Sequence, residues 1–372
     1  MKARRIAIFR ALQLGDMLCM TPALRALRSA QPDSHITLIG LPWAREFVQR
    51  LSALVDDFVA FPGLPGFPEQ TPDPAAMPGF IAAMRARRFD LLLQMHGSGE
   101  RSNALLAQFD AHSVAGFCPA DATANAADPR LFLRWDEHQN EVLRLLAIVQ
   151  HLGMPACGQQ LEFPLTQADF DDLRRAAPGL APAGTYLCLH PGARFGSRRW
   201  PAERFAQAAS SLAAHSLQVV VTGSAQESSL TAAVCAQLPQ AVRASVLDLT
   251  GRTTLGSLGA LIAGARLLVC NDTGVSHLAA ALAVPSVVVC SGADVRRWSP
   301  LDRQRHRVLW AQTACRPCMH RECPYAGHPC AWAVSVEQVT RAAGALLAVS
   351  GDETFRRRHE TGSVRVTAQP MK

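Results

Sequence analysis

The sequence predicts an α/β protein of two domains, each built from short parallel strands that alternate with helices. Its 372 residues exceed the ~250 to 300 at which one hydrophobic core usually stops growing. Both halves alternate β-rich runs with helical patterns, which is typical of βαβ units. Residues 164–184, with their repeated Ala-Pro steps, have the composition of a linker and contain a short predicted helix. We therefore expect Rossmann-like domains at 1–165 and 184–345, followed by a basic, flexible tail at 346–372.

In the first half, four apolar runs predict strands, at 6–9, 36–40, 91–94 and 114–117. Leu18, Leu24 and Leu27 share one face of a helix predicted at 17–30, and Pro22 lies in its first turns, where proline costs little. The segment 61–79, rich in proline and glycine, predicts a long surface loop, and a helix at about 137–151 closes this half.

In the second half, strands are predicted at 186–189, 218–223, 267–270 and 286–289, with helices between them. Ligands of open α/β sheets bind beyond the carboxyl ends of the strands. Most of the polar motifs described below follow a predicted strand. The sequence therefore places the candidate chemistry at two sheet edges.

The composition, with 49% hydrophobic and 18% charged residues, is that of an ordinary globular protein. No run approaches the ~18 apolar residues of a membrane span, and the amino terminus leads directly into a strand, so we expect a cytoplasmic protein. Most of the 11 cysteines stand alone in apolar runs, which favours a reducing compartment. The net charge of +7 favours anionic partners. Aromatics are only 6% and much of the basic excess lies at 356–358, which disfavours nucleic acid.

The first motif is the loop around Asp16, after the first predicted strand. A carboxylate at a helix amino terminus stays ionised because free N–H groups and the helix dipole stabilise it, which suits a general base. Gly15 would let the backbone turn sharply at the strand end. An ordinary helix N-cap at Asp16 is the structural alternative.

The second and third motifs follow strands of the second half. Gly192 and Ala193 would expose backbone N–H groups to an anion, and the Arg198 guanidinium can make forked hydrogen bonds to the same phosphates. A basic surface loop is the alternative. Further on, the Asp272-Thr273-Gly274 turn predicts an anion cradle in which Asp272 accepts hydrogen bonds from sugar hydroxyls. Helix capping by Asp272 or Thr273, with His277 simply packed, is the alternative there.

A fourth motif is a cysteine cluster whose spacing is not that of a standard zinc finger. Reduced thiols or a redox-sensitive disulfide are favoured over a structural zinc site. The chain has no Asp-x-Asp pair of the kind that holds a divalent ion against a diphosphate, so we expect no metal cofactor. The four thiols are those of Cys315, Cys318, Cys323 and Cys330.

Three of these motifs, taken in order, resemble those of glycosyltransferase family 9, typified by the ADP-heptose:lipopolysaccharide heptosyltransferases. They are Arg-Ala-Leu-Gln-Leu-Gly-Asp-Met-Leu at 10–18, His-Pro-Gly-Ala at 190–193 with Arg-Arg-Trp-Pro at 198–201, and Asn-Asp-Thr-Gly-Val-Ser-His at 271–277. The resemblance runs from about residue 5 to 339. The cysteine-rich segment is similar to one in the branch that adds the second heptose.

The resemblance implies a GT-B architecture, with two Rossmann-like domains, for acceptor and donor, facing across a cleft. It implies metal-independent, inverting transfer of heptose from an ADP-sugar to the lipopolysaccharide inner core, at the inner membrane face. Arg198 stands where the family usually has a lysine on the diphosphate, a change that keeps the charge but alters the geometry. By the same resemblance Asp16 is the base, Glu227 binds the ribose, and the ADP-sugar site includes Asp272, Thr273, Gly274 and His277.

Alternatives stay open: a GT-B enzyme with another nucleotide-sugar donor, or a non-catalytic protein that binds nucleotide sugar or core glycolipid. A zinc-dependent scaffold or nucleic-acid binder centred on the cysteines is a third. His96 and Arg101 are placed to meet a phosphorylated acceptor, with a satisfied surface pair as the alternative.

Overall fold

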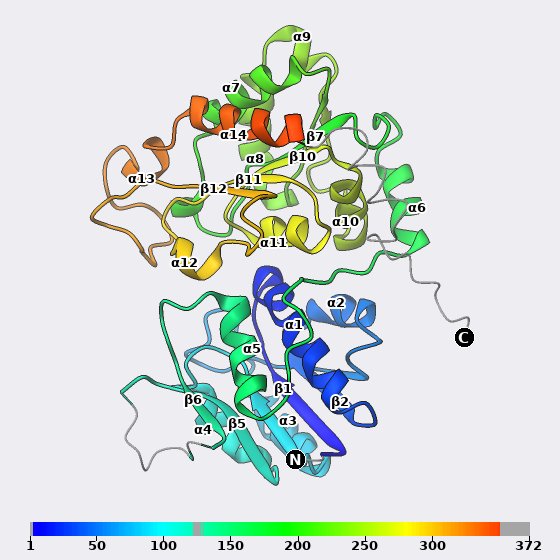
Figure 1. The fold of residues 1–372 in the computed structure, drawn as a ribbon, viewed down its shortest axis with the longest axis vertical. Helices are drawn as coiled ribbons and strands as arrows, with labels where there is room; N and C mark the ends of the chain where they lie inside the picture. The colour runs from blue at the N-terminus through cyan, green and yellow to red at the C-terminus, as the bar shows by residue number, and fades with distance from the viewer. Residues whose placement is uncertain (1–2, 122–127, 129, 350–372) are drawn as a thin grey trace. The chain divides into compact units, whose positions relative to one another are not determined.

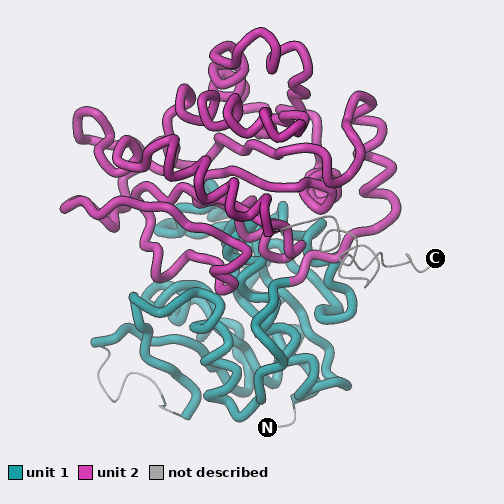
Figure 2. The backbone as a smooth tube through the Cα atoms, turned by 45° about the horizontal axis from the view of Figure 1, so that its top comes forward, with its two compact units in different colours: residues 1–161 teal, residues 162–372 magenta. Residues whose placement is uncertain are grey.

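The computed structural model describes residues 3–121, 128 and 130–349, and the chain divides into two compact units, residues 1–161 and 162–372 (Figure 2). Each unit has one six-stranded sheet whose strand pairs are all parallel (Figure 1). Strands buried on both faces explain the near-continuous apolar runs in the sequence.

Unit 1 has the strand order β3-β2-β1-β4-β5-β6. Its strands are β1 Arg5–Phe9, β2 His35–Gly40, β3 Asp57–Ala60, β4 Leu91–Gln94, β5 Ser113–Cys118 and β6 Phe132–Arg134. Its helices are α1 Leu14–Ala30, α2 Ala44–Arg50, α3 Met77–Ala86, α4 Ser102–Leu106, the short 3₁₀ helix η1 Ala107–Phe109, and α5 Glu141–His151. The order reverses between β1 and β4, which makes the carboxyl ends of these two strands the expected ligand site.

Unit 2 repeats this topology, because its order β12-β11-β10-β7-β8-β9 reverses between β7 and β10 in the same way. Its strands are β7 Tyr186–His190, β8 Gln218–Val221, β9 Leu247–Asp248, β10 Leu267–Asn271, β11 Ser286–Val289 and β12 His306–Leu309. Its helices are α6 Gln167–Ala176, η2 Gly196–Arg198, α7 Ala202–Ala213, η3 Ala225–Glu227, α8 Ser228–Ala236, α9 Gln240–Arg243, α10 Leu255–Gly264, α11 Gly274–Ala281, α12 Val295–Trp298, α13 Pro329–Trp332 and α14 Val336–Val349. The predicted α/β class with two Rossmann-like sheets is confirmed.

Helix α1 begins at Leu14, three residues before the predicted start, so Pro22 lies in its interior rather than in its first turns. Proline has no N–H to donate to the carbonyl four residues earlier. The Thr21 hydroxyl donates to that carbonyl, of Leu18, at 2.8 Å. This local replacement allows the helix to continue to Ala30.

The boundary regions differ in detail from the predicted ones. Unit 2 begins at Glu162, and α6, predicted as part of a linker, packs against α10 within it. Helix α14 continues to Val349, so four residues of the predicted tail are helical, and Leu346 is buried in the core of unit 2. The basic residues 356–358 lie outside the described residues. Among the helices that the structure describes, none is long and apolar enough to cross a lipid bilayer.

Candidate active site

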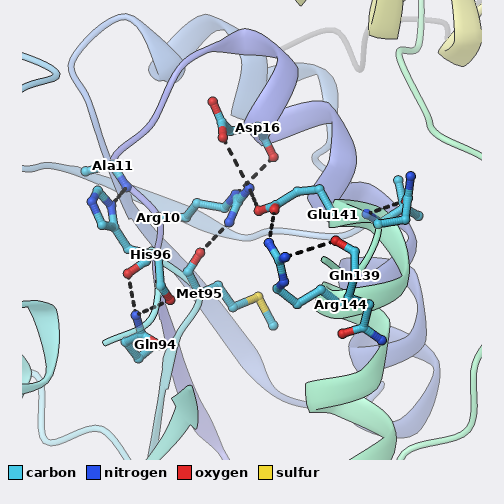
Figure 3. A network of polar contacts seen from close by, with 12 residues as sticks. Arg10, Ala11, Asp16, Gln94, Met95, His96, Gln139, Glu141 and Arg144 are labelled. Carbon is cyan, nitrogen blue, oxygen red and sulfur yellow. Dashed lines mark hydrogen bonds and ion pairs between the residues drawn. The ribbon is translucent and has the colours of Figure 1, made fainter. Parts of the chain in front are cut away.

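Arg10 lies at the carboxyl end of β1, at the point where the strand order of unit 1 reverses. Its side chain is fully buried and donates three hydrogen bonds to three different elements (Figure 3). Nε donates to the Asp16 carbonyl at 2.9 Å, Nη2 to Glu141 Oε1 at 2.9 Å, and Nη1 to the Met95 carbonyl just after β4. Arg10 therefore ties the ends of β1 and β4 to the first turns of α1 and α5.

Asp16 lies in the first turn of α1, with its side chain 21% exposed. Its Oδ1 is 3.7 Å from Arg10 Nη2, and its second carboxylate oxygen points away from Arg10 (Figure 3). The N-cap is Gln13, so the alternative that Asp16 caps the helix is wrong. Gly15 lies inside the helix, and the sharp turn expected there is absent. The carboxylate nevertheless lies in the field of a helix amino terminus, as predicted for an ionised side chain.

Glu141 is shared between two buried guanidinium groups. Its Oε1 accepts from Arg10, and its Oε2 pairs with Arg144 Nη1 at 2.5 Å. The Arg144 guanidinium also stacks over the Trp135 ring, 3.8 Å from its centroid. Buried charges are tolerated when they are paired and hydrogen-bonded in this way.

His96 follows β4 and lies beside Arg10. Burial, with the Arg10 charge in addition, lowers the pKa of His96 to about 3, so the ring is neutral at pH 7. Its Nδ1 accepts from the Ala11 amide at 3.3 Å, and its ring packs against those of Phe9 and Phe67. His96 could therefore contact an acceptor phosphate only as a neutral hydrogen-bond donor. Arg101, the other residue predicted to meet that phosphate, donates a hydrogen bond to the Gly66 carbonyl.

In unit 2, the loop after β7 brings Gly192 against Glu227. A Cβ at Gly192 would lie 2.2 Å from Glu227 Oε1, so the close approach of this carboxylate requires glycine. The other oxygen, Glu227 Oε2, accepts from the Ser224 amide at 2.8 Å in a capping box. Burial lowers the pKa of the neighbouring His190, although the Glu227 charge opposes this shift. The loosely aligned Glu227 thus lies beside the predicted Gly192-Ala193 loop.

Arg198 ends the 3₁₀ turn η2 and is held by the cysteine-rich segment through a hydrogen bond from Nη2 to the Cys318 carbonyl. Its Nη1 is buried and has no hydrogen-bond partner within the described part of the chain. This nitrogen faces Gly292, just after β11, where a Cβ would lie 2.8 Å away. A buried cationic donor without an acceptor is costly, and an anionic ligand would supply the acceptor.

The turn after β10 is held by Asn271, which is fully buried. Its amide donates to the Pro191 carbonyl at 2.7 Å and accepts from the Trp200 amide at 2.9 Å, so it joins the second and third motifs. Thr273 caps α11 by accepting from the Val275 amide at 3.2 Å, which confirms the capping alternative for this residue.

The remaining residues of this motif lie close by. The Asp272 amide donates to Val289, and its carboxylate lies 3.8 Å from the Cys290 thiol. Gly274 begins α11, and the buried His277 ring meets that of Trp298 edge-on at 6.2 Å. The structure therefore places the predicted donor residues after the carboxyl ends of β7, β8 and β10.

The four clustered cysteines carry free thiols. Burial is the main cause that raises the pKa of Cys330, and the three other thiols raise it further. Over the ranges described, no three His, Cys, Asp or Glu side chains are grouped so that they could hold a metal ion. The contacts that this segment does make are structural, through the Cys318 carbonyl to Arg198 and through the His320 carbonyl to Ser197.

Sequence reasoning assigned no individual role to Arg10, Glu141, Asn271 or Gly292, although Arg10 and Asn271 lie within the motifs described above. Arg10 and Asn271 carried a usable signal, since each is a polar residue at the carboxyl end of a buried strand. Glu141 and Gly292 carried none, because their importance comes from partners far away in the sequence.

Comparison with known proteins shows the family to which this chain is similar. The model of glycosyltransferase family 9 (heptosyltransferase) matches residues 79–328. Lipooligosaccharide heptosyltransferase 2 of Campylobacter jejuni is 29% identical over 219 residues, which are 57% of this chain and 65% of that protein. Lipopolysaccharide heptosyltransferase 2 of Escherichia coli is 35% identical over 120 residues, 32% of this chain and 34% of that protein. The chain thus matches 65% of the length of the first relative and 34% of the length of the second, which is less than two thirds in both cases.

Solved structures show the same fold. ADP-heptose lipopolysaccharide heptosyltransferase II of E. coli superposes with a TM-score of 0.71 at 21% identity, over 93% of this chain and 99% of that chain. The family 9 glycosyltransferase of Veillonella parvula superposes with a TM-score of 0.76, also at 21% identity, over 93% and 98%. These superpositions confirm the predicted GT-B fold. Since the family model covers more than half of the chain, the protein belongs to glycosyltransferase family 9.

Proposed function

We propose that this protein transfers a heptose, or a related sugar, from an ADP-sugar to an acceptor on the inner core of lipopolysaccharide. The observation that carries the proposal is the buried Arg198 Nη1, which has no acceptor in the described chain and lies among loops suited to a diphosphate. The curated relatives are named as heptosyltransferases. Structures of an E. coli heptosyltransferase contain ADP and ADP-2-deoxy-2-fluoro heptose.

Unit 2 is the donor domain in this proposal. Arg198, the Gly192 and Ala193 amides and the turn at Thr273 and Gly274 would stabilise the negative charge that develops on the leaving ADP. For the rest of the donor, Glu227 would accept from the ribose hydroxyls, Asp272 from the sugar hydroxyls, and His277 would line the same site. This charge compensation comes from the protein alone, so the transfer would proceed without a metal.

Unit 1 is the acceptor domain, and Asp16 is the general base. The acceptor oxygen attacks the anomeric carbon while its proton passes to the Asp16 carboxylate, and the bond from that carbon to the diphosphate oxygen breaks with its electron pair going to ADP. A single displacement of this kind inverts the anomeric configuration. Because the hydroxyl becomes acidic only as its new bond forms, a carboxylate of ordinary basicity is sufficient. The acceptor is a membrane glycolipid, so the protein would work at the cytoplasmic face of the inner membrane.

The test is a donor screen with ADP- and UDP-sugars against a heptose-deficient core acceptor, with and without EDTA. We expect transfer from ADP-heptose in both conditions, with an inverted anomeric centre by NMR. Asp16→Asn should lower turnover by about 10² to 10⁴-fold with little change in ADP affinity. Binding of ADP without transfer to any core acceptor would contradict the proposal, and loss of activity in EDTA would contradict its metal-independent step.

A further inference from the structure

We propose that Arg10 and Glu141 are positioning residues that jointly set the proton affinity of Asp16. The inference rests on the proposed role of Asp16 as general base. Its physical basis is the sharing of one buried guanidinium by two carboxylates, one of them buried and one facing outward (Figure 3).

Arg10 contacts Asp16 in two different ways, through a hydrogen bond to its backbone and through the charge near its carboxylate. Arg10 holds the backbone of Asp16 through the 2.9 Å hydrogen bond to its carbonyl, which fixes where the first turn of α1 begins. The Asp16 carboxylate itself stays 3.7 Å from Nη2, beyond a good hydrogen bond. Glu141 takes the direct contact with that same nitrogen, at 2.9 Å. Arg10 thus orients Asp16 through its backbone and does not donate a short hydrogen bond from the guanidinium to its carboxylate.

The charges of the network balance. Arg10 and Arg144 carry two positive charges, Glu141 and Asp16 two negative ones, and only Asp16 has more than 1% of its side chain exposed. In such a poorly solvated region each charge acts strongly on the others. If the Arg10 guanidinium were paired with Asp16 alone, Asp16 would be a weak base. If Glu141 were left without Arg10, its negative charge would make Asp16 retain its proton. Sharing keeps Asp16 ionised and still able to accept a proton.

Two further titratable groups of unit 1 lie near this network. His96, from the end of β4, is neutral at pH 7 because of its burial. The loop before α3 approaches through Glu69, whose carbonyl accepts from Gln13 Nε2 at 3.5 Å. The pH response of Asp16 within unit 1 should therefore be governed by Arg10, Glu141 and Arg144.

The proposal predicts shifts of opposite sign for two substitutions in one network. Glu141→Gln leaves the whole Arg10 charge to Asp16, so the acidic limb of the kcat/KM profile for the acceptor should move to lower pH and turnover should fall about tenfold. Arg10→Gln leaves Asp16 facing Glu141, so the limb should move to higher pH. A charge at this distance typically shifts a carboxyl titration by about one unit or more, which such a profile resolves.

The experiment is the pH dependence of kcat/KM between pH 4 and 9 for the full-length protein, with the donor KM as a second readout. Glu46→Gln is the matched control, because Glu46 pairs with Arg50 at 3.1 Å on the exposed face of α2 and its loss should move neither quantity. Arg10→Lys, which retains the charge, should restore the position of the limb but not the full rate. If Glu141→Gln fails to fold, Arg144→Gln is a second variant: it leaves Glu141 wholly to Arg10, so the limb should move to higher pH, as in Arg10→Gln, and a limb that stays in place or moves to lower pH would contradict the proposal.

Two different failures can be told apart. Full activity of Asp16→Asn would remove the general base and with it the proposed function. An inactive Asp16→Asn together with an acidic limb that does not move, or that moves the same way in the Arg10 and Glu141 variants, would overturn only the positioning proposal.

Discussion

Replacing Arg198 by glutamine should weaken nucleotide binding without weakening the fold. The substitution removes a buried N–H that lacks a partner in the described chain, and also the hydrogen bond to the Cys318 carbonyl, so its two effects on stability oppose each other. In the complex, the same change removes a charge-assisted hydrogen bond to the diphosphate, which is worth about 1.5 to 3 kcal/mol. At about 1.4 kcal/mol per factor of ten, ADP affinity should fall roughly 10- to 150-fold.

The assay is calorimetric titration of ADP into the wild type and the variant, with thermal unfolding of both in the absence of nucleotide. Arg174→Gln is the control, since Arg174 lies on the exposed face of α6 and pairs with Asp171. An ADP Kd within about twofold of the wild type, with unchanged unfolding, would refute the reasoning. A large loss of stability without nucleotide would show instead that the guanidinium is part of the fold.

Three further outcomes follow from single contacts. Gly192→Ala would place a methyl group 2.2 Å from Glu227 Oε1, so calorimetry should show ADP affinity lowered by about 10- to 100-fold, and an unchanged Kd would exclude this contact from the site. Asn271→Leu would leave the Trp200 amide and a loop carbonyl unpaired in the interior, which should cost about 2 to 6 kcal/mol in urea unfolding; a cost below about 1 kcal/mol would contradict this. Burial lowers the pKa of His306 to about 4, so as the pH falls the unfolded chain takes up this proton near pH 6.5, before the folded protein does. The contribution of neutral His306 to the free energy of unfolding, about 3 kcal/mol at most, should be constant above pH 6.5 and lost between pH 6.5 and 4. In His306→Gln, the free energy of unfolding measured in urea should depend less on pH over that range.

The central strands and the motifs that follow them could be predicted from the sequence, because both depend on local patterns. Continuous apolar runs predicted β1, β4, β7 and β10, and each is buried in a parallel sheet. The edge strands β3, β6, β9 and β12 were not predicted. They are only two to four residues long and partly exposed, so they show neither a continuous apolar run nor a clear alternation.

Helix starts were predicted less well, for a physical reason visible at α5. The helical pattern suggested a start near 137, whereas the helix begins at Glu141 because the Asn140 side chain accepts from the Val142 amide and caps it there. At α11 the cap is Thr273, so the helix begins at Gly274, the last residue of the predicted anion turn. In both cases a side-chain hydrogen bond outweighed the apolar periodicity.

The sequence by itself determined the fold class, the family resemblance and the Asp16, Arg198 and Asp272 motifs, since these are written in short runs of neighbouring residues. Only the tertiary structure decided that Arg10 and Glu141, separated by 131 positions, share one buried ion pair, and that Arg198 turns toward Gly292 a nitrogen that has no partner among the described residues. It also decided that His96 is neutral. The reason is that these features depend on which distant segments the packed sheet brings together. Hydrogen-bond partners, desolvation and the space for a Cβ cannot be predicted from a local sequence pattern.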